Sequence, residues 1–147
     1  RAFAQASGLL SLADDSGLEV EALGGAPGLH SKRYSPVPGA NDADRRALLL
    51  KNLRAAGAEP PWTAQFRAVI ALATPDGRLE LAEGICPGEI IPEERGSGGF
   101  GYDPIFLLSE MGLTMAELDR EQKNRLSHRG RAVRAAWPVL LRLLAEE

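Results

Sequence analysis

The sequence predicts a single domain of the α/β or α+β class, in which helices flank a mixed β-sheet. Helix-like and strand-like segments follow one another along the chain, and no linker, internal repeat or low-complexity tract divides the 147 residues. The composition is that of a chain with a buried core, because 44% of the residues are hydrophobic and 25% are charged. A formal net charge of −3 argues against a protein that coats polyanions.

The first part of the chain predicts a helix end, two strands and a loop. Residues 1–7 (RAFAQAS) are typical of the last turns of a helix. A buried strand is expected over 9–13, ending at the acidic pair that follows it. A half-exposed strand is expected over 18–23, where apolar and acidic residues alternate. The glycines and prolines of 24–39 then predict an irregular loop.

The middle of the chain predicts a helix and a long hairpin. Asn41 or Asp42 can cap a helix that runs to about residue 56. Residues 63–74 and 78–91 are strand-like, and the Pro-Asp-Gly sequence between them is a turn signal, so they predict an antiparallel hairpin. Two glycines and a proline in 84–88 predict a bend or bulge in its second arm.

The last part predicts a glycine loop over 96–103, a short strand over 105–108 and two helices. A capping-box pattern at 114–117 (TMAE) is expected to open the first helix. The second is expected to begin near Ser127 and to run to Glu146, with a kink or a restart at Pro138.

Cysteine content and hydropathy indicate a compartment. Cys86 is the only cysteine, which excludes an intramolecular disulfide and a multi-cysteine metal cluster, and its apolar neighbours favour a buried structural thiol. No apolar run approaches the roughly 20 residues that span a bilayer. A cytoplasmic protein without membrane contact is therefore expected.

Three segments could carry chemistry. Asp14-Asp15-Ser16-Gly17 follows a predicted strand, and its carboxylates suit a hard cation such as Mg²⁺ or a base that activates water. The alternative is an Asp-Ser-Gly turn capped by its own side chains. Because neighbouring strand residues point to opposite faces, one carboxylate is expected to face a cleft while the other braces the backbone.

The other two segments are the glycine loop and a basic segment. In the loop, glycines flank Phe100 and would leave its ring free to stack on a flat ligand; the alternative is a plain connection with Phe100 in the core. In the basic segment 123–129, Ser127 can cap a helix and place His128 and Arg129 in its first turn, where free N–H groups favour oxygen ligands. The alternative there is a solvated basic face. His30 is expected to be a surface or packing residue.

Taken together, residues 12–35 (LADDSGLEVEALGGAPGLHSKRYS), 96–106 (GSGGFGYDPIF) and 127–130 (SHRG) resemble the inosine triphosphate pyrophosphatase, or Ham1-like, family. The resemblance covers essentially the whole chain. It implies hydrolysis of ITP, dITP and XTP to the monophosphate and pyrophosphate with Mg²⁺, by a homodimer whose subunits form two lobes around a nucleotide-binding cleft.

The resemblance also implies roles for individual residues. Asp15 matches the proton acceptor and Mg²⁺ ligand, with Asp14 beside it as a second acidic contributor to the metal. The residues that match substrate contacts are Ser16, Phe100, Gly101, Tyr102, Asp103, Lys123, His128 and Arg129.

Family members begin with a phosphate-binding Asn-x-x-Lys loop and a metal-binding Glu, and 1–147 contains no such segment. The resemblance thus implies a single domain that lacks its N-terminal strand and helix, roughly 50–65 residues. Little or no activity is expected from the 147 residues alone.

Three other functions stay open at this point. One is a nucleotide pyrophosphatase of another base preference, and another is a dimerising domain without catalysis. The third is a nucleic-acid-binding module that uses the arginines of 125–142, which the net charge of −3 and the lack of interleaved aromatic residues oppose.

Overall fold

A six-stranded sheet forms the centre of the protein, of which the computed structural model describes residues 1–146. The strands are β1 (Ser11–Val20), β2 (Pro27–Gly28), β3 (Trp62–Ala73), β4 (Leu79–Ile90), β5 (Phe106–Leu108) and β6 (Leu113–Thr114). Their order in the sheet is β2-β1-β3-β4-β5-β6, and every pairing is antiparallel. The expected mixed sheet is therefore wrong for residues 1–146. The chain leaves β1 and re-enters at β3 from the same end of the sheet, since Val20 pairs with Ala64, so no crossover makes a parallel pair.

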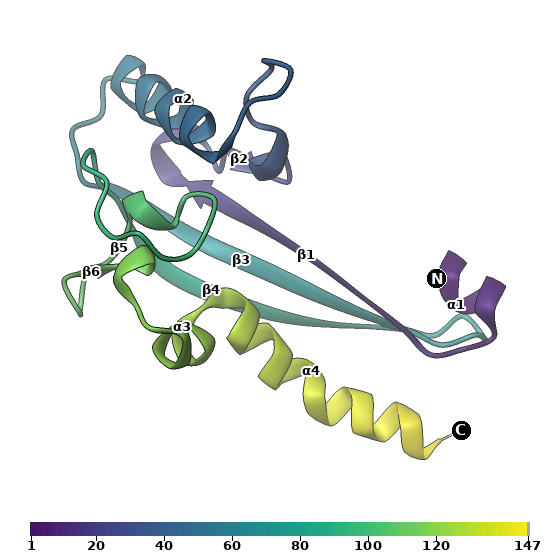
Figure 1. Cartoon of the computed structure of the whole chain (residues 1–147). Helices are drawn as coiled ribbons and strands as arrows, with labels where there is room; N and C mark the ends of the chain where they lie inside the picture. The colour runs from purple at the N-terminus through teal and green to yellow at the C-terminus, as the bar shows by residue number, and fades with distance from the viewer. Residues whose placement is uncertain (147) are drawn as a thin grey trace.

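Within residues 1–146, four α-helices accompany the sheet, namely α1 (Ala2–Ser7), α2 (Asp42–Ala55), α3 (Arg120–Leu126) and α4 (His128–Ala145). In Figure 1, α4 runs beside the long arm formed by β1, β3 and β4, and α2 lies near β2. No helix within residues 1–146 combines the length and the apolar character that a membrane crossing needs. The predicted combination of helices with a sheet is thus confirmed.

The two strands expected over 9–23 are one continuous strand, β1. Its register with β3 is unbroken from Ser11, opposite Ala73, to Val20, opposite Ala64. The acidic pair consequently lies within a strand, and both the predicted strand end and the alternative turn are wrong. The reason is that β3 offers backbone partners along all of β1, and a backbone ladder forms whatever the polarity of the side chains.

The β3–β4 hairpin is confirmed, but the expected bulge in its second arm is absent. Pairing continues without an insertion from Trp62 opposite Ile90 to Ala73 opposite Leu79. Pro87 is accommodated because β5 pairs only with Glu89 and Ile90, so no partner on that side needs its missing N–H group.

The C-terminal helices depart from expectation at two points. The capping box at Thr114 and Glu117 exists, but it encloses a 3₁₀ turn, and Leu118 is already extended. Helix α3 begins only after a second capping box, formed by Asp119 and Gln122. A kink or a restart was expected at Pro138, and α4 continues through it without a restart. Around the proline, Ala136, Val139 and Leu140 pack in the cluster that contains Ile70 and Leu72 of β3, and this packing supports the turn in which the proline lacks a hydrogen bond.

Both core clusters lie on one face of the sheet. Side chains of β3 alternate, so Phe66, Ala68 and Ile70 point to the same side. Phe66 belongs to a cluster that includes Leu49 and Leu53 of α2, whereas Ala68 and Ile70 belong to a second cluster beneath α4. Helices α2 and α4 therefore cover different ends of the same face, and the site described below lies between them.

The beginning of α4 rests directly on β4 at Gly84. A Cβ atom at this glycine would overlap the carbonyl oxygen of His128 and the backbone nitrogen of Ala132. Only glycine allows the helix backbone to approach the strand so closely. This contact sets the distance between the sheet and the backbone of His128.

We expect Gly84→Ala to lower the free energy of unfolding by about 1–3 kcal/mol, because the added methyl group forces α4 away from β4. Urea denaturation measures the effect. Leu81→Ala on the same strand is the control, since Leu81 is 63% exposed and its truncation is expected to cost no more than about 0.5 kcal/mol. An unchanged midpoint for Gly84→Ala would contradict the close packing of α4.

Candidate active site

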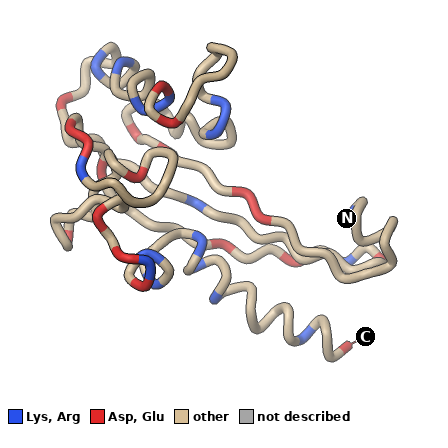
Figure 2. Tube along the Cα trace, in the orientation of Figure 1, with Lys and Arg blue, Asp and Glu red and all other residues tan. Residues whose placement is uncertain are grey.

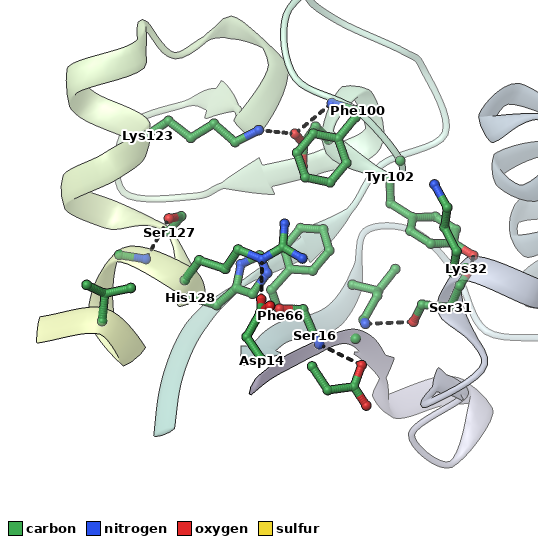
Figure 3. Close-up of a pocket in the computed structure, with 18 of the residues that line it drawn as sticks. Asp14, Ser16, Ser31, Lys32, Phe66, Phe100, Tyr102, Lys123, Ser127 and His128 are labelled. Atoms are coloured by element: carbon green, nitrogen blue, oxygen red, sulfur yellow. Dashed lines mark hydrogen bonds and ion pairs between the residues drawn. The ribbon is translucent and has the colours of Figure 1, made fainter. Parts of the chain in front are cut away.

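A cavity of about 780 Å³ opens between α2 and α4, and all the site residues predicted from the sequence line it. They come from β1, from the glycine loop, from α3 and from the first turn of α4, as Figure 3 shows. These residues are Asp14, Asp15, Ser16, Phe100, Gly101, Tyr102, Asp103, Lys123, His128 and Arg129. The fold thus brings together three segments that are far apart in the sequence.

The two carboxylates of β1 have different surroundings. Asp14 accepts a hydrogen bond at its Oδ2 from Arg129 Nε at 3.2 Å. The Oδ1 atom of Asp15 accepts from the backbone N–H of Ser16 at 2.9 Å. Besides the main cavity, both carboxylates also line a smaller hollow beside Arg67 and Val69. Asp14 and Asp15 thus border the same two hollows, and Asp14 is in addition tied to α4 through Arg129.

Two polar atoms in the cavity wall are buried without a hydrogen-bond partner among the described residues. They are Ser16 Oγ and His128 Nδ1. The His128 ring lies flat against Phe66, with the ring centroids 4.8 Å apart and an interplanar angle of 16°. Buried polar groups are normally paired, so two unpaired ones in one cavity favour a polar ligand that supplies their partners.

His128 is neutral at pH 7 in this environment. Burial is the largest cause that lowers the pKa of His128 from 6.5 to about 4, and the nearby charges of Arg129 and Lys123 contribute to the same shift. A neutral imidazole offers one N–H donor and one lone pair, so it can pair with a carbonyl oxygen or an N–H group of a ligand.

The glycine loop presents an open aromatic ring. Phe100 is 58% exposed, so the alternative that it belongs to the core is wrong. Lys123 Nζ lies 4.6 Å from the centre of its ring, and the Arg129 guanidinium carbon lies at 5.7 Å. Figure 3 shows Phe100 and Tyr102 on the same side of the cavity. Tyr102 is buried, and its hydroxyl donates to the Ser31 carbonyl oxygen at 2.7 Å.

Asp103 ties the loop to α3. Its Oδ2 atom pairs with Lys123 Nζ at 2.5 Å and accepts from the Phe100 N–H at 3.1 Å. At the start of α4, Ser127 Oγ accepts from the Gly130 N–H at 3.1 Å, which confirms the predicted cap. The cap leaves His128 and Arg129 in the first turn, beside the cavity.

Several lining residues were not predicted. Lys32, Asp42, Arg45 and Phe66 all contribute to the cavity wall. Phe66 is an ordinary core position in the strand pattern, and Asp42 looks like a helix cap. No local signal links Asp42 to the cavity, because its partner Gly101 is 59 positions away. His30 is exposed and Cys86 is buried, as expected.

The carboxylates of Asp14 and Asp15 are the type of ligand that Mg²⁺ prefers, but only these two side chains of β1 offer one at the cavity. No three His, Cys, Asp or Glu side chains within residues 1–146 lie close enough to hold a metal by themselves. Mg²⁺ is commonly held by one or two carboxylates together with substrate phosphates and water, and such a site needs no third protein ligand. Asp15 fits this role better than Asp14, which already pairs with Arg129.

The charged residues of the chain are spread over the fold, and Figure 2 shows acidic positions on the long strands.

One family model and several known proteins match most of this chain. The model of the Ham1 family matches residues 1–139. A protein of Desulforamulus reducens named dITP/XTP pyrophosphatase is 50% identical over 142 residues, which cover 97% of this chain and 70% of the relative. One of the same name from Nostoc sp. is 50% identical, and the match covers 97% of this chain and 69% of the relative. The chain thus spans roughly 70% of the length of these relatives.

Solved structures agree with the sequence relatives. The HAM1 protein of Coxiella burnetii has a TM-score of 0.88 at 43% identity, with 95% of this chain and 71% of the other covered. The Staphylococcus aureus Ham1 protein has a TM-score of 0.85 at 38% identity, covering 99% of this chain and 72% of the other.

We expect the His128 ring to titrate near pH 4, because burial disfavours its charged form. The unfolded chain takes up the proton near 6.5 and the folded chain only near 4, so stability falls as the pH drops through this window. Proton NMR gives the midpoint, and His128→Gln assigns the signal. Urea unfolding at pH 7 and pH 4.5 should show a smaller pH effect for His128→Gln than for the wild type; a ring midpoint above 6 would contradict the burial.

Proposed function

The chain belongs to the Ham1 family, and from this premise we propose that it forms the larger part of a Mg²⁺-dependent pyrophosphatase for ITP, dITP and XTP. The reaction yields the nucleoside monophosphate and pyrophosphate and removes these nucleotides from the pool. The observation that carries the proposal is the single cavity into which β1, the glycine loop and the start of α4 bring three chemically different groups of residues.

The purine base would lie between the glycine loop and α4. Phe100 offers an exposed ring face for stacking. His128 and Arg129 supply donors for the 6-carbonyl oxygen of hypoxanthine or xanthine, whereas adenine presents an amino group there. A buried donor left unpaired costs about 1–3 kcal/mol, so each such contact disfavours adenine tenfold or more. Ser16 Oγ, which is buried without a partner among the described residues, is a further ligand contact.

The hydrolytic step needs a base and a cation. Asp15 would accept a proton from the water that attacks the α-phosphorus, while the bond from that phosphorus to the bridging oxygen breaks and pyrophosphate leaves. Mg²⁺, when bound, offsets the charge of the phosphates. Asp15 would be its main protein ligand, and Asp14 would act beside it while orienting Arg129 through their ion pair at 3.2 Å.

The proposal also covers the domain organisation, the oligomeric state, the location and the base preference of the protein. Residues 1–147 are taken as one domain, in which the α2 cluster and the α4 cluster form two lobes around the nucleotide. The homodimer and the cytoplasmic location stay predictions, and the sedimentation coefficient of the purified protein tests the former. Another base preference would appear as a higher kcat/KM for GTP or dTTP than for ITP.

We expect full-length protein to release pyrophosphate from ITP with Mg²⁺, and Asp15→Asn to reduce kcat by about 10²–10⁴, the usual contribution of a general base. Pyrophosphate release measures both. Asp76→Asn, in the β3–β4 turn outside the cavity, is the control and should keep the wild-type rate. Removal of Mg²⁺ by a chelator should abolish turnover; an unchanged rate for Asp15→Asn would refute its role, and no release of pyrophosphate by the wild type would refute the function.

Phe100→Ala should raise KM for ITP by about tenfold or more, because base stacking contributes about 1–3 kcal/mol. Steady-state kinetics with ITP measures the change, and Phe100→Tyr, which keeps the ring, should stay near the wild-type KM. Equal KM values for Phe100→Ala and the wild type would place the base elsewhere.

A further inference from the structure

Helix α2 forms hydrogen bonds with the glycine loop at Gly101. Gly101 donates its N–H to Asp42 Oδ2 at 2.9 Å, and its carbonyl oxygen accepts from Arg46 Nη1 at 2.7 Å. The N–H belongs to the peptide bond that joins Gly101 to Phe100, and the carbonyl belongs to the one that joins it to Tyr102. Both peptide bonds beside Gly101 are therefore fixed to one helix.

The two α2 residues are themselves anchored. Asp42 accepts through its other oxygen, Oδ1, from Arg45 Nη2 at 2.5 Å. The side chain of Arg46 is 12% exposed, and it donates to Glu94 from Nε at 2.7 Å and from Nη2 at 3.3 Å. These contacts leave Asp42 Oδ2 and Arg46 Nη1 directed at Gly101. We call this pair of residues the Gly101 clamp.

The clamp is formed at the start of α2. Asn41 and Asp44 form a capping box at the start of the helix, so the backbone of its first turn is fixed. The hydrogen bonds from Arg45 and from Gly101 lower the pKa of Asp42 below its usual value. Asp42 is thus a carboxylate at neutral pH, and a charge-assisted bond to an N–H is stronger than a neutral one.

The side chain of Phe100 cannot fix its own direction. It is 58% exposed, and the charged groups over its ring, Lys123 and Arg129, are held by ion pairs with Asp103 and Asp14 and not by the ring. Gly101 adopts a φ of 61°, a conformation open to glycine and uncommon for other residues, so the bend after Phe100 depends on its backbone. Hydrogen bonds to that backbone are what can orient the ring before a ligand arrives.

We propose that Asp42 and Arg46 are positioning residues, which hold Gly101 from both sides and so direct Phe100 toward the base of a bound nucleotide. The assignment of the ligand rests on the proposed function. The clamp itself rests on the contacts of Gly101 alone, and it lowers the ordering cost that base binding would otherwise carry.

Hydrogen exchange followed by mass spectrometry tests the clamp in the 147-residue chain without any substrate. Asp42→Ala and Arg46→Ala should each speed amide exchange in 96–103 by about tenfold, the effect of losing one charge-assisted hydrogen bond. Asp42→Asn keeps an acceptor oxygen and should restore slower exchange. Arg54→Ala is the matched control, since Arg54 lies on the same helix and has no hydrogen bond or ion pair from its side chain among residues 1–146. Wild-type exchange of 62–90 in each variant shows that the sheet is intact.

Kinetics in the full-length protein test the consequence for the base. Asp42→Ala and Arg46→Ala should raise KM for ITP by about tenfold and leave kcat within about threefold, since the lost interaction serves binding. Unchanged exchange in 96–103 overturns the clamp even if ITP is hydrolysed. Faster exchange with an unchanged KM overturns its role in base binding. Faster exchange in the variants, together with no hydrolysis by the wild type, refutes the proposed function and supports the clamp.

Discussion

Helix α4 approaches β4 at Gly84 so closely that any side chain there would overlap the backbone of His128 and Ala132, and the geometry of the site depends on this contact. It sets the first turn of α4 against the middle of the sheet, where the His128 ring stacks on Phe66. The same contact withdraws the imidazole from water, which is the main reason for its low pKa. Packing of a helix on a glycine therefore decides the charge state of a residue at the cavity.

The cavity exists because two helices divide one face of the sheet between them. Helix α2 covers the end around Phe66 and Leu18, and α4 covers the end around Ile70. In the cavity between them, the polar residues of β1 and the glycine loop meet those of α3 and of the start of α4. Charges in this space are largely paired in advance, with Lys123 on Asp103 and Arg129 on Asp14. A triphosphate and its cation would have to bind among these ion pairs. The affinity for the nucleotide would therefore depend on the charges of the whole site.

The sequence predicted the parts of this arrangement that local chemistry determines. The alternation of the hairpin strands and the caps at Asn41 and Ser127 each depend on a few neighbouring residues, whereas the exposed position of Phe100 was one of two alternatives that the glycine loop left open. Other features were not predicted, because the segments that determine them are far apart in the sequence. The acidic pair was expected at a strand end, yet β3 extends the ladder past it. The sheet was expected to be mixed, and the return of the chain to the same end of β1 made every pair in residues 1–146 antiparallel.

The amino-acid sequence by itself determined which residues could do chemistry here: a carboxylate pair, a ring among glycines, and a histidine and an arginine behind a capping serine. Their order and spacing were sufficient to indicate the family. Only the tertiary structure decided how these groups are held. Asp42 and Gly101 are 59 positions apart, and Asp14 and Arg129 are 115 apart, so no local pattern encodes either contact. Such pairs form because the sheet and its two helices bring their ends together, and a side chain's partner and pKa follow from that proximity.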